Sequence, residues 1–301
     1  MTSLLKAWIT DPELLKNIET EKENYIPKII HFCWFGQRPI PDGLQRCIDS
    51  WRISKGYTVF RWDESNCGFD ENEFVKKAYE EKKYAFVSDY YRLKALYEYG
   101  GIYLDTDVML NKSFDELLSH KMFLNFITDC SVGTAVIGSM KKGKLVKSLL
   151  DMYDTCIVRP RSERIQRKDI VIKDGQTYVY GFPTNNYFFT YYILKNYPEF
   201  MLNNKYQDLG DFVIYPKELF EIGTLSKRHY AIHLCAGEWR TNKDDINSAR
   251  EKAKNFLSNN EFLYSNIQIL FRKFRYNKMK KAIPFYSYYL AQKSGTTLPE
   301  L

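Results

Sequence analysis

Apolar residues along the chain follow two alternating patterns, short continuous runs and helical spacing. The short runs predict strands over 29–34, 57–62, 122–127, 134–137, 212–215 and 230–234, and near residues 170 and 178. Apolar positions three and four residues apart predict helices over 41–51, 74–83, 144–156 and 183–195. Because strands and helices alternate, we expect an α/β fold with a mixed, mainly parallel sheet.

The clearest junction between a helix and a strand lies within residues 84–110. Ser88 is a good N-cap residue, and a carboxylate at Asp89 would favour the dipole at that end of the helix. Two glycines at 100–101 then predict the end of the helix. The unbroken apolar run at 102–104 is typical of a strand that is buried on both faces of a sheet.

Two carboxylates follow this strand, Asp105 and Asp107, separated by Thr106. In an extended chain, residues two apart point the same way and lie roughly 7 Å apart, so both carboxylates can face one site. That site would lie at the carboxyl edge of the sheet, where open α/β sheets bind ligands. Paired carboxylates suit Mn²⁺ or Mg²⁺ bound to a diphosphate. Two aspartates at this spacing also occur by chance in solvated turns, so the strand before them gives the motif its meaning.

Length and composition predict one large domain with appendages, because 301 residues with 45% hydrophobic content can bury a substantial core. We expect a helical N-terminal arm at 1–25, a central domain at 26–243 and a basic, helical C-terminal extension at 244–301. Residues 261–301 hold seven Lys and Arg against two Glu, so this segment supplies most of the net charge of +7. A nearly neutral remainder argues against a nucleic-acid partner.

The basic and aromatic stretch at 261–292 has two interpretations. It suits peripheral contact with an anionic membrane surface, or a helix packed on the core with a solvated basic face. The six cysteines are scattered, with no Cys-x-x-Cys pair, which favours a reduced compartment. The sequence shows neither an apolar signal region near its start nor a run of about 18 apolar residues. We therefore expect a cytoplasmic protein. Any peripheral attachment would be at the inner face of the membrane.

Three segments together resemble a known family. They read IPKIIHFCWFG at 26–36, AFVSDYYRLKALYEYGGIYLDTD at 85–107 and YAIHLCAGEW at 230–239. They are similar to the DXD-containing glycosyltransferase sugar-binding family, which includes fungal α-mannosyltransferases, lactosylceramide α-galactosyltransferases and bacterial capsule transferases. The resemblance implies a GT-A, Rossmann-like nucleotide-sugar-binding fold in the central domain. It also implies Mn²⁺ or Mg²⁺ and a nucleotide-sugar donor, a UDP-hexose in preference to a GDP-hexose.

The resemblance also assigns roles to matching residues. Trp34 would lie near the nucleotide base, Asp89 and Arg92 would hold the donor sugar or ribose, Asp105 would reach the ribose or the metal, and Asp107 would bind the metal. The chemistry agrees, because an indole offers a stacking face and a guanidinium pairs with hydroxyls, carboxylates or diphosphate. Another interpretation of Arg92, compatible with the first, is an i, i+3 ion pair with Asp89.

Further candidates lie later in the chain. His233 would be a further metal ligand, or else an ordinary core or loop histidine. Trp239 would close over the diphosphate and exclude water, or else be a packed surface aromatic. Asp129 and Asn186 are candidates for donor or acceptor contacts near the reacting carbon, and we expect His31 to be structural.

Members of this family usually retain the sugar's configuration, so no obvious general base is expected, and the leaving diphosphate can deprotonate the acceptor. Many relatives have Asn immediately before the residue matching Thr134, whereas this chain has Gly133. The resemblance implies transfer of a hexose to a glycan or lipid-linked oligosaccharide in capsule or surface polysaccharide synthesis. Alternatives are an effector-type transferase that modifies a host protein and a non-enzymatic RNA- or membrane-binding module.

Overall fold

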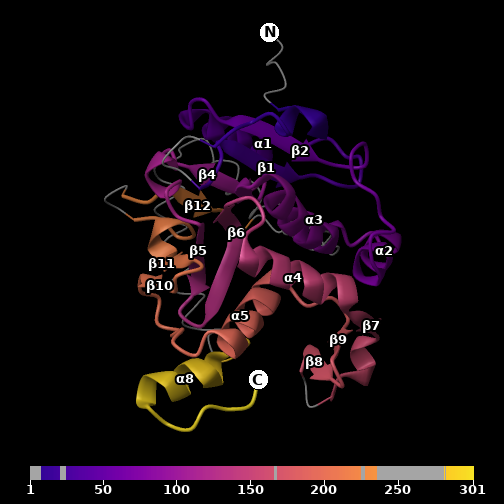
Figure 1. Cartoon of the computed structure of the whole chain (residues 1–301), viewed down its shortest axis with the longest axis vertical. Coiled ribbons are helices and arrows are strands. Elements are labelled where there is room, and N and C mark those ends of the chain that lie inside the picture. The colour runs from indigo at the N-terminus through magenta and orange to yellow at the C-terminus, as the bar shows by residue number, and fades with distance from the viewer. Residues whose placement is uncertain (1–7, 21–24, 166–167, 225–227, 236–280, 282) are drawn as a thin grey trace, which may run out of the picture.

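A mixed sheet forms the centre of the protein, as seen in the computed structural model (Figure 1). The structure describes residues 8–20, 25–165, 168–224, 228–235, 281 and 283–301. Within these residues the sheet has seven strands in the order β10-β11-β5-β6-β3-β1-β2. Their bounds are β10 Gln207–Asp208, β11 Val213–Tyr215, β5 Met122–Thr128, β6 Ser131–Ser139, β3 Gly101–Leu104, β1 Ile29–Cys33 and β2 Thr58–Trp62.

The strand directions follow from the connections between the strands. β1 pairs parallel with β2 and β3, because a helical connection separates each strand from the next, and β11 pairs parallel with β5. β5 and β6 are antiparallel because they are joined by a tight turn at 129–130, and β6 is also antiparallel to β3. The predicted mixed α/β fold class is confirmed.

Helices cover both faces of this sheet, so β1, β3 and β6 are buried along their whole length. On β1, Ile29 packs into the core beneath α3, α4 and α5, whereas Ile30 and Phe32 pack into a second core with α1. The helices are α1 Asp42–Ser50, α2 Glu73–Glu80, α3 Tyr84–Tyr99, α4 Lys144–Thr155, α5 Asn185–Asn196 and α8 Tyr286–Ser294. Short 3-10 turns are η1 Pro12–Leu15, η2 Trp51–Ile53, η3 Asp115–Leu117, η4 Arg161–Glu163 and η6 Lys217–Leu219.

Two small sheets accompany the large one. β12 (Ala231–His233) pairs antiparallel with β4 (Val108–Leu110), and β7 (Ile157–Arg159), β9 (Gln176–Tyr180) and β8 (Ile170–Lys173) form the other. The strand predicted at 230–234 is therefore present, but it belongs to a two-stranded sheet and not to the central one. β4 and β7 were not predicted from the apolar pattern.

The predicted helical N-terminal arm is wrong for residues 8–20. Ile9 lies extended beside β2, where its N–H donates to the carbonyl of Val59 and its carbonyl accepts from the N–H of Arg61, both at 2.9 Å. A single 3-10 turn follows, capped by Asp11, whose carboxylate accepts from the N–H of Glu13 at 3.0 Å. Backbone groups at the edge of a sheet offer an extended segment more hydrogen bonds than a short isolated helix would gain.

The start of α3 also differs from the prediction. The helix begins at Tyr84, and Ser88 donates its hydroxyl proton to the carbonyl of Tyr84 at 3.0 Å instead of capping the helix. The predicted end is confirmed, because Gly100 terminates the helix at φ 69°. Gly101 follows at φ 109°, where a Cβ atom would lie 2.7 Å from the carbonyl oxygen of Ile29. Only glycine permits this close passage from helix to strand.

The described part of the C-terminal extension contains one helix, α8, which packs on the domain. α8 lies at the end of the molecule away from β1 and β2 (Figure 1). Gln292 fixes it, because its side chain donates to the carbonyl of Phe200 and accepts from the N–H of Leu202, both at 2.8 Å. For α8 the packed-helix interpretation is thus supported, whereas residues 236–280 and 282, including Trp239, lie outside the described residues. Across the part of the chain that is described, no helix is both long and apolar enough to cross a bilayer.

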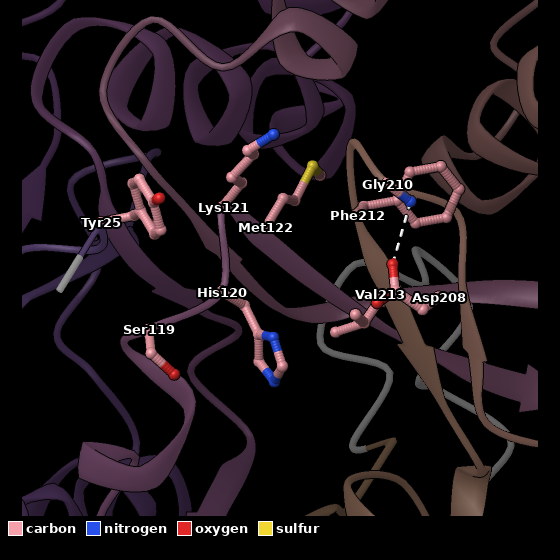
Figure 2. A pocket seen from close by; sticks show the side chains of 9 residues that line it. All are labelled: Tyr25, Ser119, His120, Lys121, Met122, Asp208, Gly210, Phe212 and Val213. Carbon is pink, nitrogen blue, oxygen red and sulfur yellow. Dashed lines mark hydrogen bonds between the residues drawn. The ribbon is translucent and has the colours of Figure 1, made fainter. Parts of the chain in front are cut away.

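A surface hollow of about 160 Å³ lies at the amino ends of β5 and β11 (Figure 2). Met122 and Val213, the first residues of these strands, line it together with Tyr25 and Asp208. Asp208 accepts a hydrogen bond from the N–H of Gly210 at 2.9 Å. None of the predicted site residues lines this hollow, which lies at the edge of the sheet opposite to Asp105 and Asp107.

Candidate metal and donor site

The two acids lie in a turn and not in an extended strand. Asp105 follows β3 and bonds through its N–H to the carbonyl of Ala135 at 2.9 Å. Its own carbonyl accepts from the N–H of Val108 at 3.0 Å, which closes a tight turn through Thr106 into β4. The expectation that an extended chain aligns the carboxylates is therefore wrong. The turn brings Asp105 and Asp107 together instead.

His233 joins the two acids through the pairing of β12 with β4. Its Cα lies opposite Val108 in the ladder, and the N–H of Leu234 donates to the carbonyl of Asp107 at 2.9 Å. As a result, His233 Nε2 lies 3.3 Å from Asp107 Oδ1. Asp105, Asp107 and His233 each offer a ligand atom, and these atoms lie within 4.8 Å of one another.

This donor set fits the metal that the sequence predicted. Carboxylate oxygens are the usual ligands of Mg²⁺ and Mn²⁺, and Mn²⁺ also accepts an imidazole nitrogen. Asp105, Asp107 and His233 could hold such an ion and leave further coordination positions for water and phosphate oxygens. The structure therefore brings the predicted ligands together, and their role in binding a metal stays a prediction.

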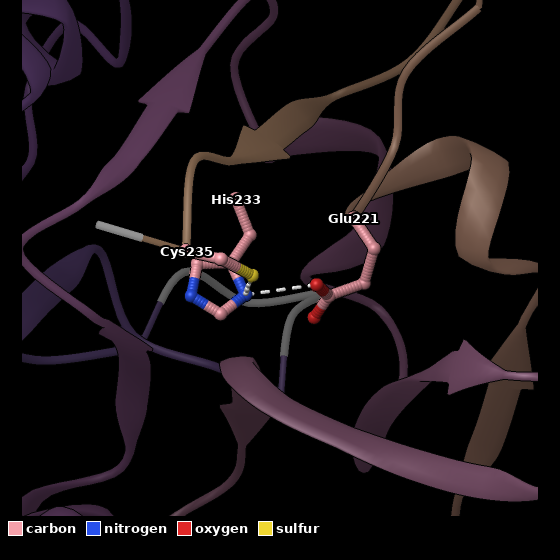
Figure 3. A group of neighbouring side chains, drawn as sticks. All are labelled: Glu221, His233 and Cys235. Atoms are coloured by element: carbon pink, nitrogen blue, oxygen red, sulfur yellow. Dashed lines mark hydrogen bonds and ion pairs between the residues drawn. The ribbon is translucent and has the colours of Figure 1, made fainter. Parts of the chain in front are cut away.

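The Nδ1 edge of the His233 ring contacts residues that the sequence did not predict (Figure 3). Its Nδ1 lies 2.8 Å from Glu221 Oε2 and 3.6 Å from Cys235 Sγ. Burial alone would lower the pKa of His233, but its electrostatic interactions with Cys235, Asp107 and Glu221 outweigh burial and raise the pKa well above its ordinary value. The one available signal for Glu221 was a charged residue directly between the apolar Phe220 and Ile222.

Arg92 lies beneath the acids and is fully engaged. One guanidinium nitrogen lies 2.7 Å from Asp89 Oδ1 and 3.3 Å from Asp105 Oδ1, and another donates to the carbonyl of Thr134 at 2.7 Å. The guanidinium also lies over the ring of Tyr103, 4.5 Å from its centroid. The predicted ion pair with Asp89 is confirmed. Contact of Arg92 with a donor sugar stays a prediction.

Asp89 stabilises the start of α5 and not the start of α3. It lies in the second turn of α3, and its Oδ2 accepts from the N–H of Asn185, the first residue of α5, at 3.2 Å. A carboxylate there interacts favourably with the dipole of α5, so the predicted dipole interaction occurs with a different helix. Burial raises the pKa of Asp89 to about 7, although Arg92 opposes that shift. Binding of a sugar by Asp89 stays a prediction.

Asp105 is held by two groups at the same oxygen. The hydroxyl of Tyr103 donates to its Oδ1 at 3.1 Å, and Arg92 approaches that atom as well. Burial raises the pKa of Asp105, against the opposing charges of Arg92 and His233. The carboxylate is thus fixed in orientation beside Asp107, as a ligand of a compact metal site must be.

Comparison with known proteins agrees with this geometry. Residues 41–124 match a family model described as the glycosyltransferase sugar-binding region containing the DXD motif. The chain carries this DXD sugar-binding region. The matched range includes Asp89, Arg92 and both acids of the turn at 105–107, hereafter the DXD turn. The predicted resemblance to the DXD-containing family is confirmed for this region.

Curated relatives of the DXD region are fungal. Inositol phosphoceramide mannosyltransferase 3 of Schizosaccharomyces pombe is 32% identical over 148 residues, which cover 46% of this chain and 40% of that protein. A mannosyl phosphorylinositol ceramide synthase of Saccharomyces cerevisiae is 32% identical over 136 residues, covering 41% and 35%. The chain therefore spans less than half the length of these relatives. A solved structure titled PaToxG Glycosyltransferase is 19% identical with a TM-score of 0.41, covering 57% of this chain and 70% of that one.

Trp34 follows β1 at the same edge as the DXD turn. β1 and β3 are in parallel register with His31 opposite Tyr103, so the residues after both strands emerge side by side. The N–H of Trp34 donates to the carbonyl of Trp62 at 2.9 Å, and its indole N–H donates to the carbonyl of Arg38 at 2.6 Å. Its predicted contact with a base is untested.

The two remaining candidates contact other elements than the DXD turn. Asp129, in the turn after β5, forms an ion pair with Lys217 of η6. Asn186 donates its side-chain N–H to the carbonyl of Val132 at 2.8 Å, which ties α5 to β6. Both are held at the carboxyl ends of strands or beside them. Their contact with donor or acceptor stays a prediction.

His31 is structural, as expected. It is fully buried in β1, where its Nδ1 accepts from the indole N–H of Trp62 at 3.2 Å and its Nε2 donates to the carbonyl of Gly100 at 2.7 Å. Burial lowers the pKa of His31 to about 4, although its bond to Gly100 opposes the shift. The ring is therefore neutral at ordinary pH, with both nitrogens engaged.

Proposed function

We propose that the protein is a metal-dependent glycosyltransferase that moves a hexose from a nucleotide sugar to a glycan or lipid-linked oligosaccharide. One observation carries this proposal: Asp105, Asp107 and His233 converge at the carboxyl edge of an α/β sheet, within a chain that carries the DXD sugar-binding region. Ligands bind at this edge in open α/β sheets. Retention of the sugar's configuration is part of the proposal.

The chain supplies a rigid cradle for the diphosphate of the donor. Asp105, Asp107 and His233 would hold Mn²⁺ or Mg²⁺, which when bound neutralises the charge that develops on a leaving diphosphate. Arg92 keeps Asp105 and Asp89 in place, because one of its guanidinium nitrogens contacts both carboxylates. Trp34, which follows β1 at the same edge, would stack on the nucleotide base.

A donor screen tests the reaction class without an acceptor. The purified protein is incubated with UDP-hexoses and GDP-hexoses in the presence of Mn²⁺, and release of free sugar is measured. We propose a UDP-hexose as donor. GDP-mannose belongs in the screen because the curated relatives are named for mannosyl transfer. Release of sugar that requires the metal supports the proposal.

Nucleotide binding is tested separately by thermal unfolding. UDP with Mn²⁺ should raise the Tm, and Asp107→Ala should abolish that shift, because the diphosphate is bound largely through the metal. Asp70→Ala is the matched control, since the side chain of this aspartate is 88% exposed and forms a surface ion pair with Lys76. If neither UDP nor GDP shifts the Tm of the wild type in the presence of Mn²⁺, the proposed function is wrong.

We propose a lipid-linked acceptor in surface polysaccharide synthesis, with the protein in the cytoplasm and at the inner membrane face. The named relatives act on an inositol phosphoceramide or make a mannosylated one, which favours a lipid among possible acceptors. Labelled donor is supplied with membrane lipids, soluble glycans or a lysate of host proteins. Label in the lipid fraction supports the proposal, and NMR of that product gives its anomeric configuration. Label in protein bands would show an effector-type transferase instead.

A further inference from the structure

Glu221 is a carboxylate with no exposed surface that lies behind the proposed metal ligand His233. Its Oε2 lies 2.8 Å from His233 Nδ1, and its backbone carbonyl accepts from the N–H of His233 at 3.1 Å. Removing a charge from water costs several kcal/mol unless other groups compensate. His233 is therefore one partner of this buried carboxylate, and the backbone bond holds the two residues side by side (Figure 3).

The second oxygen of Glu221 is held from inside the central sheet. Oε1 accepts from the side-chain N–H of Asn125 at 3.3 Å, and Asn125 is a fully buried polar residue in β5. Gly133 lies opposite Asn125 in β6. A Cβ atom there would lie 2.5 Å from Asn125 Nδ2 and 3.0 Å from Glu221 Oε1. The absence of a side chain at Gly133 thus leaves the space that the two polar groups occupy.

We propose that Glu221 is a positioning residue that fixes the imidazole of His233 for metal binding. The inference rests on the proposed metal-dependent function. With Nδ1–H donating to the Glu221 carboxylate, Nε2 is the ring nitrogen that points toward Asp107, 3.3 Å from its Oδ1, and it would lose its proton to solvent when an ion binds there. A carboxylate behind a metal-bound histidine sets the ring's tautomer and orientation and strengthens it as a ligand.

The distances argue against a different use of the same residues. Glu221, His233 and Cys235 also place ligand atoms within 4.8 Å of one another, which could suit a thiophilic ion. Two ligands bound to one tetrahedral zinc at about 2.0–2.1 Å lie about 3.3 Å apart. His233 Nδ1 and Glu221 Oε2 are only 2.8 Å apart, which is a hydrogen-bond distance. The pair is therefore a donor and an acceptor and not two ligands of a common ion.

The test is the affinity of the full chain for Mn²⁺ alone, measured by EPR of free Mn²⁺ during titration. Glu221→Ala should weaken binding about 10- to 100-fold, the usual effect of losing a carboxylate behind a ligand. Glu221→Gln should recover most of that loss, because its amide oxygen can still accept from Nδ1–H. Gly133→Ala should weaken binding in the same direction by displacing Glu221. Gly43→Ala, where the nearest atom to a Cβ is 3.9 Å away, is its control.

A spectroscopic signature separates positioning from general destabilisation. Pulsed EPR of bound Mn²⁺ should show coupling to an imidazole ¹⁴N in the wild type and in Glu221→Gln, and that coupling should weaken or disappear in Glu221→Ala. Folding of each variant is checked by circular dichroism. Should Glu221→Ala fail to fold, Glu221→Gln and Gly133→Ala still decide the matter, because only the latter is expected to lose the nitrogen coupling.

Three results would overturn the inference. If folded Glu221→Ala binds Mn²⁺ as tightly as the wild type, with the nitrogen coupling intact, Glu221 does not position His233 and the proposed function survives. If Cys235→Ser weakens binding as much as Glu221→Ala, the ion lies on the thiol side of the ring. If the wild type binds no Mn²⁺, or if Asp107→Ala binds it as well as the wild type does, the proposed function fails together with the inference.

Discussion

His233 Nε2 lies 3.3 Å from Asp107 Oδ1, although the two residues are far apart in sequence. The contact depends on a ladder of three residue pairs, in which β12 runs antiparallel to β4 and places His233 opposite Val108. The proposed metal site is therefore assembled from the DXD turn and from the end of a strand that lies outside the central sheet.

Mn²⁺ should stabilise the protein through this pair. At a concentration 100-fold above its Kd, a metal that binds only the folded state raises the free energy of unfolding by about 2.7 kcal/mol. Urea denaturation with Mn²⁺ and with EDTA measures the difference. Asp107→Ala and His233→Ala should each remove most of it, and the double variant should lose little more, because both residues bind the same ion. Independent, additive losses would contradict a shared site.

Arg92 should contribute far more to stability than an ordinary surface arginine. Its side chain is only 6% exposed and contacts Asp89 and Asp105, so Arg92→Ala leaves the buried Asp89 and the half-buried Asp105 without this cation. We expect a loss of about 3–5 kcal/mol in the free energy of unfolding, measured by urea denaturation. Arg92→Lys should recover part of it, since lysine keeps the charge but lacks the planar fork.

The matched control for Arg92 is another Arg and Asp pair at i, i+3 spacing. Arg52 lies 3.3 Å from Asp49 with its side chain 50% exposed, and exposed pairs contribute about 1 kcal/mol or less. Arg52→Ala should therefore have little effect. Equal losses in the two variants would mean that burial of the Arg92 cluster has no energetic consequence.

Local patterns predicted the elements better than the contacts between them. Strands and helices are evident from apolar runs because each run reflects burial of that segment alone. The start of α3 was misplaced, because Ser88 and Asp89 satisfy the local rule for a helix start while their actual partners are Tyr84 and Asn185. Asp89 contacts α5, which lies far away in the sequence. A rule that considers only neighbouring residues therefore could not predict the role of Asp89.

The candidate site divides in the same way. Asp105, Asp107, Arg92 and His233 were predicted from motifs, and the structure brings them together. Glu221 was not predicted, because its role depends on partners from β12 and β5 that the sequence does not align. The extended geometry proposed for the acids was also wrong. The chain turns between β3 and β4, and β4 then pairs with β12.

The docking of α8 should depend on Gln292. Its side chain makes two hydrogen bonds to the backbone at 200–202, and a net loss of about 1 kcal/mol per bond is expected in Gln292→Ala. Amides of α8 should then exchange with deuterium faster, while those of the central sheet change little. Lys293→Ala, at the neighbouring exposed position, should leave the exchange unchanged. Equal exchange in the two variants would show that α8 is held by other contacts.

His31 should make the protein sensitive to mild acid. Its pKa is lowered to about 4 in the fold, whereas the unfolded chain takes up a proton on this side chain near pH 6.5. Between these values the unfolded state binds more protons, so the free energy of unfolding falls as the pH falls. One pKa unit corresponds to about 1.4 kcal/mol, so the total loss is about 3 kcal/mol.

His31→Gln tests this through the change of its stability with pH, and not through its stability at any one pH. Other groups also titrate between pH 6.5 and 4, so the measured quantity is the difference in urea-denaturation stability between variant and wild type at each pH. That difference should shift in favour of the variant as the pH falls, because glutamine takes up no proton. His120→Gln is the comparison: burial also lowers the pKa of His120, but this histidine is only partly buried and bonds to the hydroxyl of Tyr215 at 2.9 Å, so its difference from the wild type should shift less with pH. A constant offset between His31→Gln and the wild type at every pH would mean that His31 accepts a proton in the fold as readily as in the unfolded chain.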